Sequence, residues 1–177
     1  MGLVIEFVSE HEIDECAEQE LANLLDRCFP GTFEARTYFK QLPHRRLIAE
    51  KGGAIVGQMG IDHRIIRVGE KILEIAGAID LCVSPEVQNR GIASHLLEAF
   101  ERRFQNADFF VLMADDQRLY RRRGYETLMV AKTKWLANEE RSSFGVIEKD
   151  LSDCFMFKPA KTTSWPSRTI DMLGYLF

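Results

Sequence analysis

Residues 88–93, with the sequence QNRGIA, lie where an apolar run ends and an amphipathic segment begins. The first turn of a helix has backbone N–H groups without internal partners, and the helix dipole favours an anion there. Gly91 has no side chain and Ala93 has only a methyl group, so a pyrophosphate could approach the backbone closely, and Arg90 adds a positive charge. An ordinary strand-to-helix turn would explain Gly91 equally well. The patterns G-x-x-x-x-G-K-[ST] and G-x-G-x-x-G are missing, which excludes the two common nucleotide loops.

Asp80 is a second candidate for chemistry, because it interrupts the apolar run 75–83. A carboxylate in such a run is costly unless it is paired, and this cost favours a functional role. Glu74, on the same predicted strand, is a weaker candidate. His63 could also accept a proton, but a lone His on an exposed sheet face is more often structural.

The N-terminal elements are predicted from periodicity. Residues 3–8 alternate as a short strand, and residues 10–28 carry apolar positions at helical spacing. Thr32 is predicted to cap a second short helix that runs through Leu42. Three strands follow, at 46–50, 54–66 and 72–83, and the Gly-bearing turns between them predict antiparallel pairing.

Residues 92–104 form an amphipathic helix in this prediction, and residues 109–114 form a strand buried on both faces. This strand–helix–strand order predicts a parallel crossover. Asp115-Asp116 should cap a short helix that ends at Gly124, and a final long strand should cover 127–136. The last forty residues look less regular.

The predicted fold is α/β, with a mixed, largely antiparallel central sheet, a parallel strand–helix–strand crossover and helices on both faces. It would form a single domain over residues 1–177, with a core of about 3–136 and a C-terminal extension of about 137–177. Aromatic residues of this extension could form a lid, an acceptor pocket, part of the core or a dimer contact. They are Phe155, Phe157, Trp165, Tyr175 and Phe177.

Three segments together resemble the GCN5-related N-acetyltransferase (GNAT) superfamily. Residues 88–93 resemble its Q/R-x-x-G-x-G/A motif, with Ala93 in the last small position, and residues 81–85 resemble the preceding strand end. Residues 120–126 (YRRRGYE) resemble its later Y-x-x-x-G-F/Y-E element. A narrower similarity to nodulation N-acyltransferases, and in layout to aminoglycoside N-acetyltransferases, rests on residues 58–69 and 165–167.

The resemblance implies an acyl donor, acetyl-CoA or another acyl-CoA, whose thioester is attacked directly by a primary amine in a ternary complex. The pantetheine arm would pair with the strand end, where backbone N–H groups would also polarise the thioester carbonyl. Cys82 would then be a packing residue rather than a nucleophile. The implied cofactor contacts are Leu81, Cys82, Val83, Gln88, Asn89, Arg90, Gly91, Ile92, Ala93, Ser94 and Arg123.

The resemblance also implies that Tyr120 is the general acid that protonates the departing thiolate. The alternative is a tyrosine whose ring packs in the core. Asp80 is the best candidate for the base, although it could instead hold the substrate ammonium or cap a backbone group. The donor could be an acyl-carrier protein, and a non-catalytic acyl-CoA sensor on the same fold is the competing hypothesis.

Composition limits the class of protein. The chain has 177 residues, 46% hydrophobic and 28% charged, with a formal charge of -4, which argues against disorder and against nucleic acid as a partner. Four widely spaced cysteines match neither a metal site nor a disulfide framework. We expect a cytoplasmic protein without a metal or a membrane span, acting on a small-molecule or protein amine, with a homodimer as an open alternative.

Overall fold

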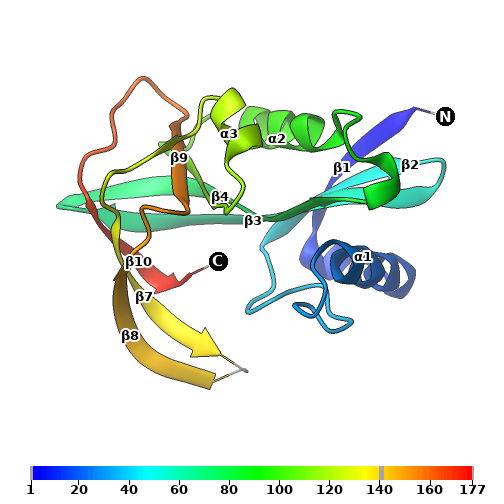
Figure 1. Ribbon diagram of the computed structural model, residues 1–177, viewed down its shortest axis with the longest axis horizontal. Coiled ribbons are helices and arrows are strands. Elements are labelled where there is room, and N and C mark those ends of the chain that lie inside the picture. Colours follow the sequence, from blue (N-terminus) through cyan, green and yellow to red (C-terminus); the bar gives the residue numbers. More distant parts are fainter. Residues whose placement is uncertain (1, 140–141, 177) are drawn as a thin grey trace. The chain divides into compact units, whose positions relative to one another are not determined.

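The computed structural model describes residues 2–139 and 142–176 (Figure 1). The chain divides into two compact units: unit 1 is Met1–Asp62 with Ala78–Arg103, and unit 2 is His63–Gly77 with Phe104–Phe177. The elements are β1 (Leu3–Ser9), the 3₁₀ helix η1 (Glu10–Glu12), α1 (Glu15–Cys28), β2 (Arg45–Lys51), β3 (Ala54–Val68), β4 (Lys71–Val83), the 3₁₀ helix η2 (Pro85–Val87), α2 (Ile92–Arg103), β5 (Phe109–Met113), α3 (Arg118–Arg122), β6 (Glu126–Thr127), β7 (Lys132–Glu139), β8 (Ser142–Asp150), β9 (Phe155–Pro159) and β10 (Thr169–Tyr175).

Unit 1 is built on the strands β1, β2 and β3, which pair antiparallel in sequence order, with β4 beside β3. Figure 1 shows α1 and α2 on opposite sides of these strands. Asp14 caps α1 by accepting a hydrogen bond from the Ala17 N–H at 2.8 Å. The apolar stripe of α1, including Leu21 and Leu25, is buried against the sheet residue Ile48. This packing fixes one face of the sheet that carries Asp80 and the strand end before residue 84.

Unit 2 contains the other halves of β3 and β4. The strand order of the sheet is β6-β9-β5-β4-β3-β10-β7-β8. β9 pairs antiparallel with β5, whereas β10 pairs parallel with β7. Its core is aromatic: the Trp165 ring packs 4.9 Å from the rings of both Phe109 and Phe157, and Phe155 is completely buried. These tail aromatics are therefore core residues. Phe177 lies outside the described residues.

The predicted fold class is confirmed, because the chain forms a mixed α/β fold with a largely antiparallel sheet. The three predicted strands of the meander are observed within two residues at each end, as β2, β3 and β4. Helix α2 and strand β5 each end one residue before the prediction. The division into a core and a C-terminal extension stays a prediction.

The helix predicted from Thr32 to Leu42 is wrong. Glu34 and Ala35 take left-handed φ angles of 52° and 62°, which end any helical turn there. The Ala35 N–H donates to Asp26 on α1 at 2.9 Å, and Phe33 is buried against the same helix. Packing against α1 therefore overrides the local preference of this segment.

Two predictions for the C-terminal part are also wrong. The strand expected at 127–136 is divided into β6 and β7, because β6 pairs with β9 whereas β7 pairs with β8 and β10. The Asp150 carboxylate accepts the Ala131 N–H at 2.9 Å in the segment between them. The tail expected to be irregular supplies the strands β8, β9 and β10.

Candidate functional site

The loop between β4 and α2 contains two residues in the left-handed conformation, Asn89 with φ 61° and Gly91 with φ 83°. Successive backbone N–H groups in a turn conformation can face one side and make an anion-binding concavity. The first intrahelical hydrogen bond of α2 runs from His95 N to Gly91 O at 3.0 Å. The N–H groups of Ile92, Ala93 and Ser94 precede this bond and have no partner within the helix.

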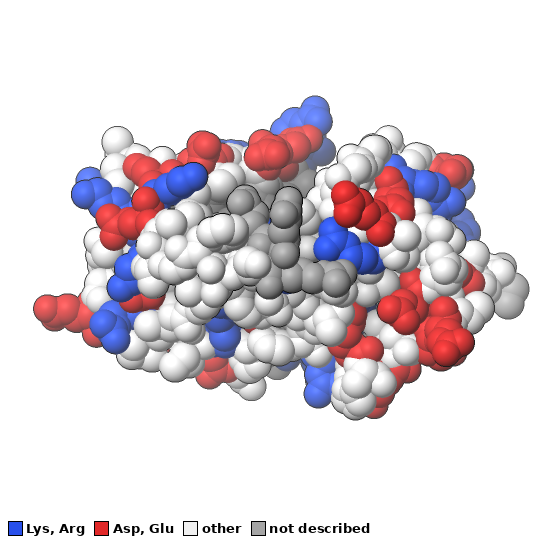
Figure 2. All heavy atoms as spheres, turned by 90° about the horizontal axis from the view of Figure 1, so that it is seen from below, with Lys and Arg blue, Asp and Glu red and all other residues white. Residues whose placement is uncertain are grey.

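The side chains of this loop divide into two kinds. Asn89 and Arg90 are exposed, whereas Ile92 is buried and anchors the helix start. On the face that Figure 2 draws, acidic and basic side chains are interspersed. The chain has a formal net charge of -4, so a phosphate at this loop would be met by the backbone N–H groups and by Arg90 rather than by a broad positive field.

The end of β4 is held by side chains. The Gln88 side chain donates to the Val83 carbonyl at 3.0 Å, and the Cys28 thiol approaches the same oxygen at 3.5 Å. Cys82 is buried, and its hydrogen bond with Cys28 and its burial raise the pKa of its thiol. A protonated, buried thiol is a poor nucleophile, which agrees with a packing role for Cys82. Leu81 is half-buried beside it.

Gly57 on β3 allows a close approach to this strand end. A Cβ atom at Gly57 would lie 3.1 Å from the Cys82 carbonyl oxygen and 3.3 Å from the Ile92 side chain. Any larger residue there would press on the strand end and on the start of α2 together. Gly57 lies outside the motifs at residues 81–94 and 120–126, and its contact was not predicted from the sequence.

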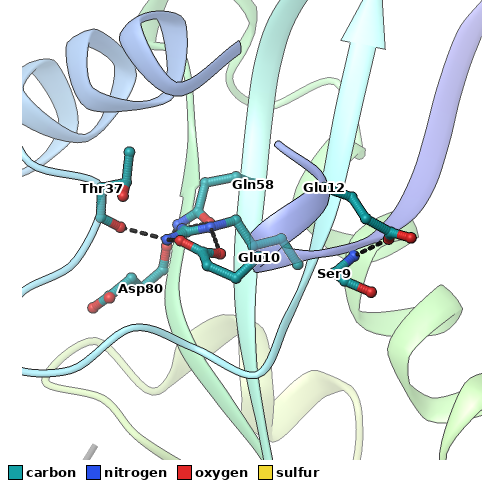
Figure 3. Close-up of polar contacts among 7 residues, drawn as sticks. Ser9, Glu10, Glu12, Thr37, Gln58 and Asp80 are labelled. Atoms are coloured by element: carbon teal, nitrogen blue, oxygen red, sulfur yellow. Dashed lines mark hydrogen bonds and ion pairs between the residues drawn. The ribbon is translucent and has the colours of Figure 1, made fainter. Parts of the chain in front are cut away.

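Asp80 departs from regular strand geometry, since its φ of 51° is left-handed within β4. Burial raises the pKa of its carboxyl group to about 6, against the opposing effect of the Arg46 charge. A carboxyl group with a pKa near neutrality can accept a proton at physiological pH and release it again. Figure 3 shows this carboxyl group pointing away from the Glu10 side chain.

A buried polar network, missed by the sequence analysis, contacts the backbone of Asp80 (Figure 3). The completely buried Arg46 donates from Nε and Nη2 to the two carboxylate oxygens of Glu10 at 2.7 and 2.8 Å. It also donates to the Thr37 carbonyl at 2.6 Å and to the Gln58 side-chain oxygen at 2.8 Å. The Gln58 amide in turn donates to the Asp80 carbonyl. Gln58 stands in an apolar stretch of β3, as Asp80 does in β4, and this was a signal that could have found it, whereas Arg46 follows Arg45 at the charged start of β2.

A second pair missed from the sequence lies where β2 begins. His44 Nδ1 is 2.9 Å from an Asp62 carboxylate oxygen, and the Asp62 side chain is only 3% exposed. Pro43, next to His44, would contact a Cβ placed on Gly60, as would Ile79, the residue before Asp80. An imidazole held by a buried carboxylate is a further group in unit 1 that can carry a proton.

Tyr120 lies on α3 in unit 2. Its ring packs edge-on against Tyr125, with centroids 5.9 Å apart, and its carbonyl accepts the Tyr125 N–H at 3.1 Å. Burial, and then the nearby Asp116 charge, raise the pKa of the Tyr120 phenol to about 12. The phenol therefore stays protonated at any physiological pH, which a proton donor requires.

The cations around Tyr120 are engaged locally. Arg118 pairs with Asp116 at 2.6 Å, and Arg121 donates to the Gln117 side chain at 2.7 Å. Asp116 also accepts the Arg118 N–H at 3.1 Å, so a side chain from just outside α3 caps it. Arg123, one of the expected cofactor contacts, is half-buried just after the helix.

The two weaker candidates for the base are paired with each other in unit 2. His63 Nε2 lies 2.8 Å from a Glu74 carboxylate oxygen, and both side chains are about half exposed. The His63 ring also packs 5.2 Å from the Phe104 ring. This arrangement is that of a surface ion pair, whereas Asp80 is a largely buried group in unit 1.

Within residues 2–139 and 142–176, no helix is both long enough and apolar enough to cross a membrane. The same described residues contain no group of three His, Cys, Asp or Glu side chains arranged to hold a metal ion.

The sequence matches the family model of an acetyltransferase (GNAT) domain over residues 11–128. This match covers well over half of the chain, and the chain therefore belongs to the GNAT acetyltransferase family. The protein is thus an enzyme of the acetyltransferase class, as its motifs predicted. Among curated protein sequences, no match was found.

Solved structures share the fold. A GNAT family N-acetyltransferase (YhbS) from Escherichia coli in complex with CoA has a TM-score of 0.68 and 16% identity, covering 96% of this chain and 89% of that one. The ribosomal-protein-S18-alanine N-acetyltransferase from Escherichia coli has a TM-score of 0.59 and 12% identity, covering 91% and 97%. Eis1 from Mycobacterium abscessus has a TM-score of 0.61 and 20% identity, covering 75% of this chain and 34% of its own. The present chain thus spans about a third of the length of Eis1.

Proposed function

We propose that this enzyme transfers an acetyl or other acyl group from coenzyme A to a primary amine, by direct attack in a ternary complex. The observation that carries the proposal is the loop between β4 and α2. Its left-handed Asn89 and Gly91 precede the three helix N–H groups that lack partners within the helix. Such a helix start suits a pyrophosphate. The similar Escherichia coli enzyme solved in complex with CoA supports the choice of this donor.

The acyl group would be activated at the end of β4. The pantetheine arm would lie along residues 81–83, and backbone N–H groups there would polarise the thioester carbonyl. The amine nitrogen then attacks the carbonyl carbon, a C–N bond forms, and the C–S bond breaks to release coenzyme A thiolate. Cys82 takes no covalent part, because its thiol pKa is raised and its side chain is buried.

Asp80 is the proposed base. An alkylamine of pKa ~10.4 is deprotonated about once per ~10³ molecules at pH 7, which is a handicap of roughly 4–5 kcal/mol. A carboxyl group whose pKa is about 6 can take that proton, directly or through water. The same carboxylate could also hold the substrate ammonium before transfer.

Tyr120 is the proposed acid. The departing thiolate has a pKa of ~8.5 and takes a proton from the phenol, which remains protonated because burial raises its pKa to about 12. Transfer from a phenol of pKa about 12 to the anion of a thiol of pKa ~8.5 is uphill by about 3.5 pKa units, or roughly 5 kcal/mol, so we expect it to be coupled to C–S cleavage rather than to precede it.

The acceptor is proposed as a primary amine on a small molecule or a protein. The weaker likeness to nodulation N-acyltransferases favours an amino-sugar type of acceptor and keeps an acyl-carrier protein as an alternative donor. We also propose a cytoplasmic location, because all four cysteines are free thiols. The competing function is a sensor that binds acyl-CoA without turnover.

Release of free thiol, measured across a panel of amines with acetyl-CoA or acetylated acyl-carrier protein as donor, tests this proposal. We expect amine-dependent release from acetyl-CoA, and its strong reduction in Tyr120→Phe. Tight acetyl-CoA binding without turnover of any amine would support the sensor instead. Turnover only with the carrier protein would reassign the donor.

A further inference from the structure

We propose that Gln58, oriented by the buried Arg46, is a positioning residue that holds the backbone of Asp80 in its left-handed conformation and so aims the Asp80 carboxylate. The inference rests on the proposed role of Asp80 as the base. It concerns the hydrogen bonds that join Arg46 on β2, Gln58 on β3 and Asp80 on β4, which we call the Gln58 clamp, rather than a further group that touches the substrate.

The orientation of the Gln58 amide follows from the chemistry of its neighbours. An arginine side chain has only hydrogen-bond donors, so the Gln58 oxygen must face Arg46 Nη1, 2.8 Å away. The amide nitrogen is thereby turned to the opposite side, where the Asp80 carbonyl accepts from it. Arg46 thus determines which end of the Gln58 amide meets Asp80.

Arg46 can fix this orientation because it is itself immobile. Its side chain is 1% exposed and forms a two-point contact with Glu10, and the Thr37 carbonyl accepts a third hydrogen bond. The β2–β3 register pairs Arg46 with Gly60 and Ile48 with Gln58. Arg46 and Gln58 are therefore diagonal neighbours across two hydrogen-bonded strands.

Asp80 needs the Gln58 clamp because its left-handed backbone conformation is unfavourable for a residue with a Cβ atom. Its φ of 51° is left-handed inside β4, and the cost of this conformation has to be offset by a restraint from the surrounding structure. Relaxation would swing the Asp80 carbonyl away from Gln58 and re-aim the side chain. The clamp therefore couples the carbonyl of Asp80 to the direction of its carboxylate.

The charges around Asp80 agree with this arrangement. Arg46 on β2 is the charge that favours the Asp80 carboxylate, but the bidentate contact with Glu10 offsets that charge. Cys82, two residues along β4, is buried with its thiol protonated and adds no charge. Burial consequently dominates and keeps the Asp80 pKa near 6 only while the side chain stays in place.

Two substitutions in the full chain separate the clamp from simple packing. Gln58→Met keeps the length of the side chain and removes both hydrogen bonds. Gln58→Glu keeps the bond from Arg46 but, when ionised, cannot donate to the Asp80 carbonyl. Gln19→Met, an exposed position on α1, is the matched control.

The first readout is NMR of the protein alone, using the Asp80 carboxyl ¹³C titration and the Asp80 backbone shifts. We expect a midpoint near pH 6 in the wild type and in Gln19→Met. In Gln58→Met the midpoint should fall by at least about one pH unit toward that of a solvated carboxyl. Both Gln58 variants should change the backbone chemical shifts of Asp80, so one folded variant is sufficient for the test.

The second readout is turnover. We expect kcat to fall at least about tenfold in both Gln58 variants, while the KM for acetyl-CoA stays within about twofold of the wild-type value. The acidic limb of the pH–rate profile of Gln58→Met should move to lower pH together with the NMR midpoint. Unchanged Asp80 shifts, or wild-type kcat in folded Gln58→Glu, would overturn the inference. Absence of turnover in the wild type would contradict the proposed function instead, and the NMR result would still decide the role of Gln58.

Discussion

The Gln88 side chain donates a hydrogen bond to the Val83 carbonyl at 3.0 Å, which ties the loop before α2 back to the end of β4. The first residue of the loop motif is thus used to shape the loop. The backbone N–H groups that follow remain for an anion, and Gly91 supplies the left-handed turn between them. We therefore predict that the backbone conformation of this loop determines the affinity for acetyl-CoA.

Gly91→Val should weaken the binding of acetyl-CoA at least about tenfold. A β-branched residue at φ 83° costs about 1–3 kcal/mol of strain, and relief of that strain would rotate the N–H groups at the helix start. Turnover of S-acetyl-N-acetylcysteamine, a thioester without phosphates, should fall much less. Gly52→Val is the matched control, because Gly52 has φ 66° in open space on the turn before β3. Equal acetyl-CoA affinities for the two variants would contradict the role of the loop.

Asp80→Asn should remove the inflection near pH 6 from the pH–rate profile. In the wild type the rate should rise as the pH increases through about 6, because only the ionised carboxylate accepts the amine proton. The asparagine side chain does not titrate there, so the variant should be slow, and its rate should rise steadily with the free-amine fraction between pH 5 and 7 without levelling off above pH 6. A variant that keeps the wild-type inflection would move the role to another group, with the His44–Asp62 pair as the first to examine.

Asp80→Asn should also be more stable than the wild type at alkaline pH. The folded pKa of about 6 exceeds the usual 3.8, so the wild type is stabilised by protonation below about pH 4 and loses that contribution as the pH rises through 6. At pH 8 the buried charge costs about 2 kcal/mol, allowing for partial solvent access. Urea unfolding at pH 4 and pH 8 measures this: the advantage of the variant should grow with pH. An advantage of equal size at both values would mean that charge burial is not its cause.

Tyr120→Phe should lower kcat about 10²-fold or more and leave the KM for acetyl-CoA nearly unchanged. The ring contact with Tyr125 is kept, so the fold should be retained. Because the phenol pKa is about 12, the wild-type rate should show no loss from Tyr120 ionisation below about pH 10. Tyr38→Phe, which removes a hydroxyl from a tyrosine contacted by Arg36 in unit 1, is the control and should retain activity. Similar kcat values for the two variants would make Tyr120 a packing residue.

The strands β2, β3 and β4 could be predicted from the sequence because local signals agree there. Apolar runs are interrupted by Gly52-Gly53 and by Gly69, all with positive φ in the observed turns. The segment after α1 could not, because it is held by long-range contacts from Phe33 and Asp26. Pattern and propensity describe neighbours along the chain, and those contacts join different elements.

The same limit applies to the site. Asp80 was identified by its type and position, whereas the loop residues were assigned to a cofactor only through the family resemblance. The structure shows a left-handed backbone at Asn89, Gly91 and Asp80. The contact from Arg46 to Gln58 depends on the β2–β3 register, which no local pattern specifies. A polar residue inside an apolar strand was a usable signal at Gln58 as well as at Asp80, but only Asp80 was predicted from it.

Calorimetric titration of the protein with acetyl-CoA tests the central claim most directly, provided that circular dichroism shows the sample to be folded. We expect saturable binding with one site per chain, weakened in Gly91→Val and unaffected in Gly52→Val. Absence of binding at millimolar acetyl-CoA would contradict the assignment of the β4–α2 loop as a coenzyme A site.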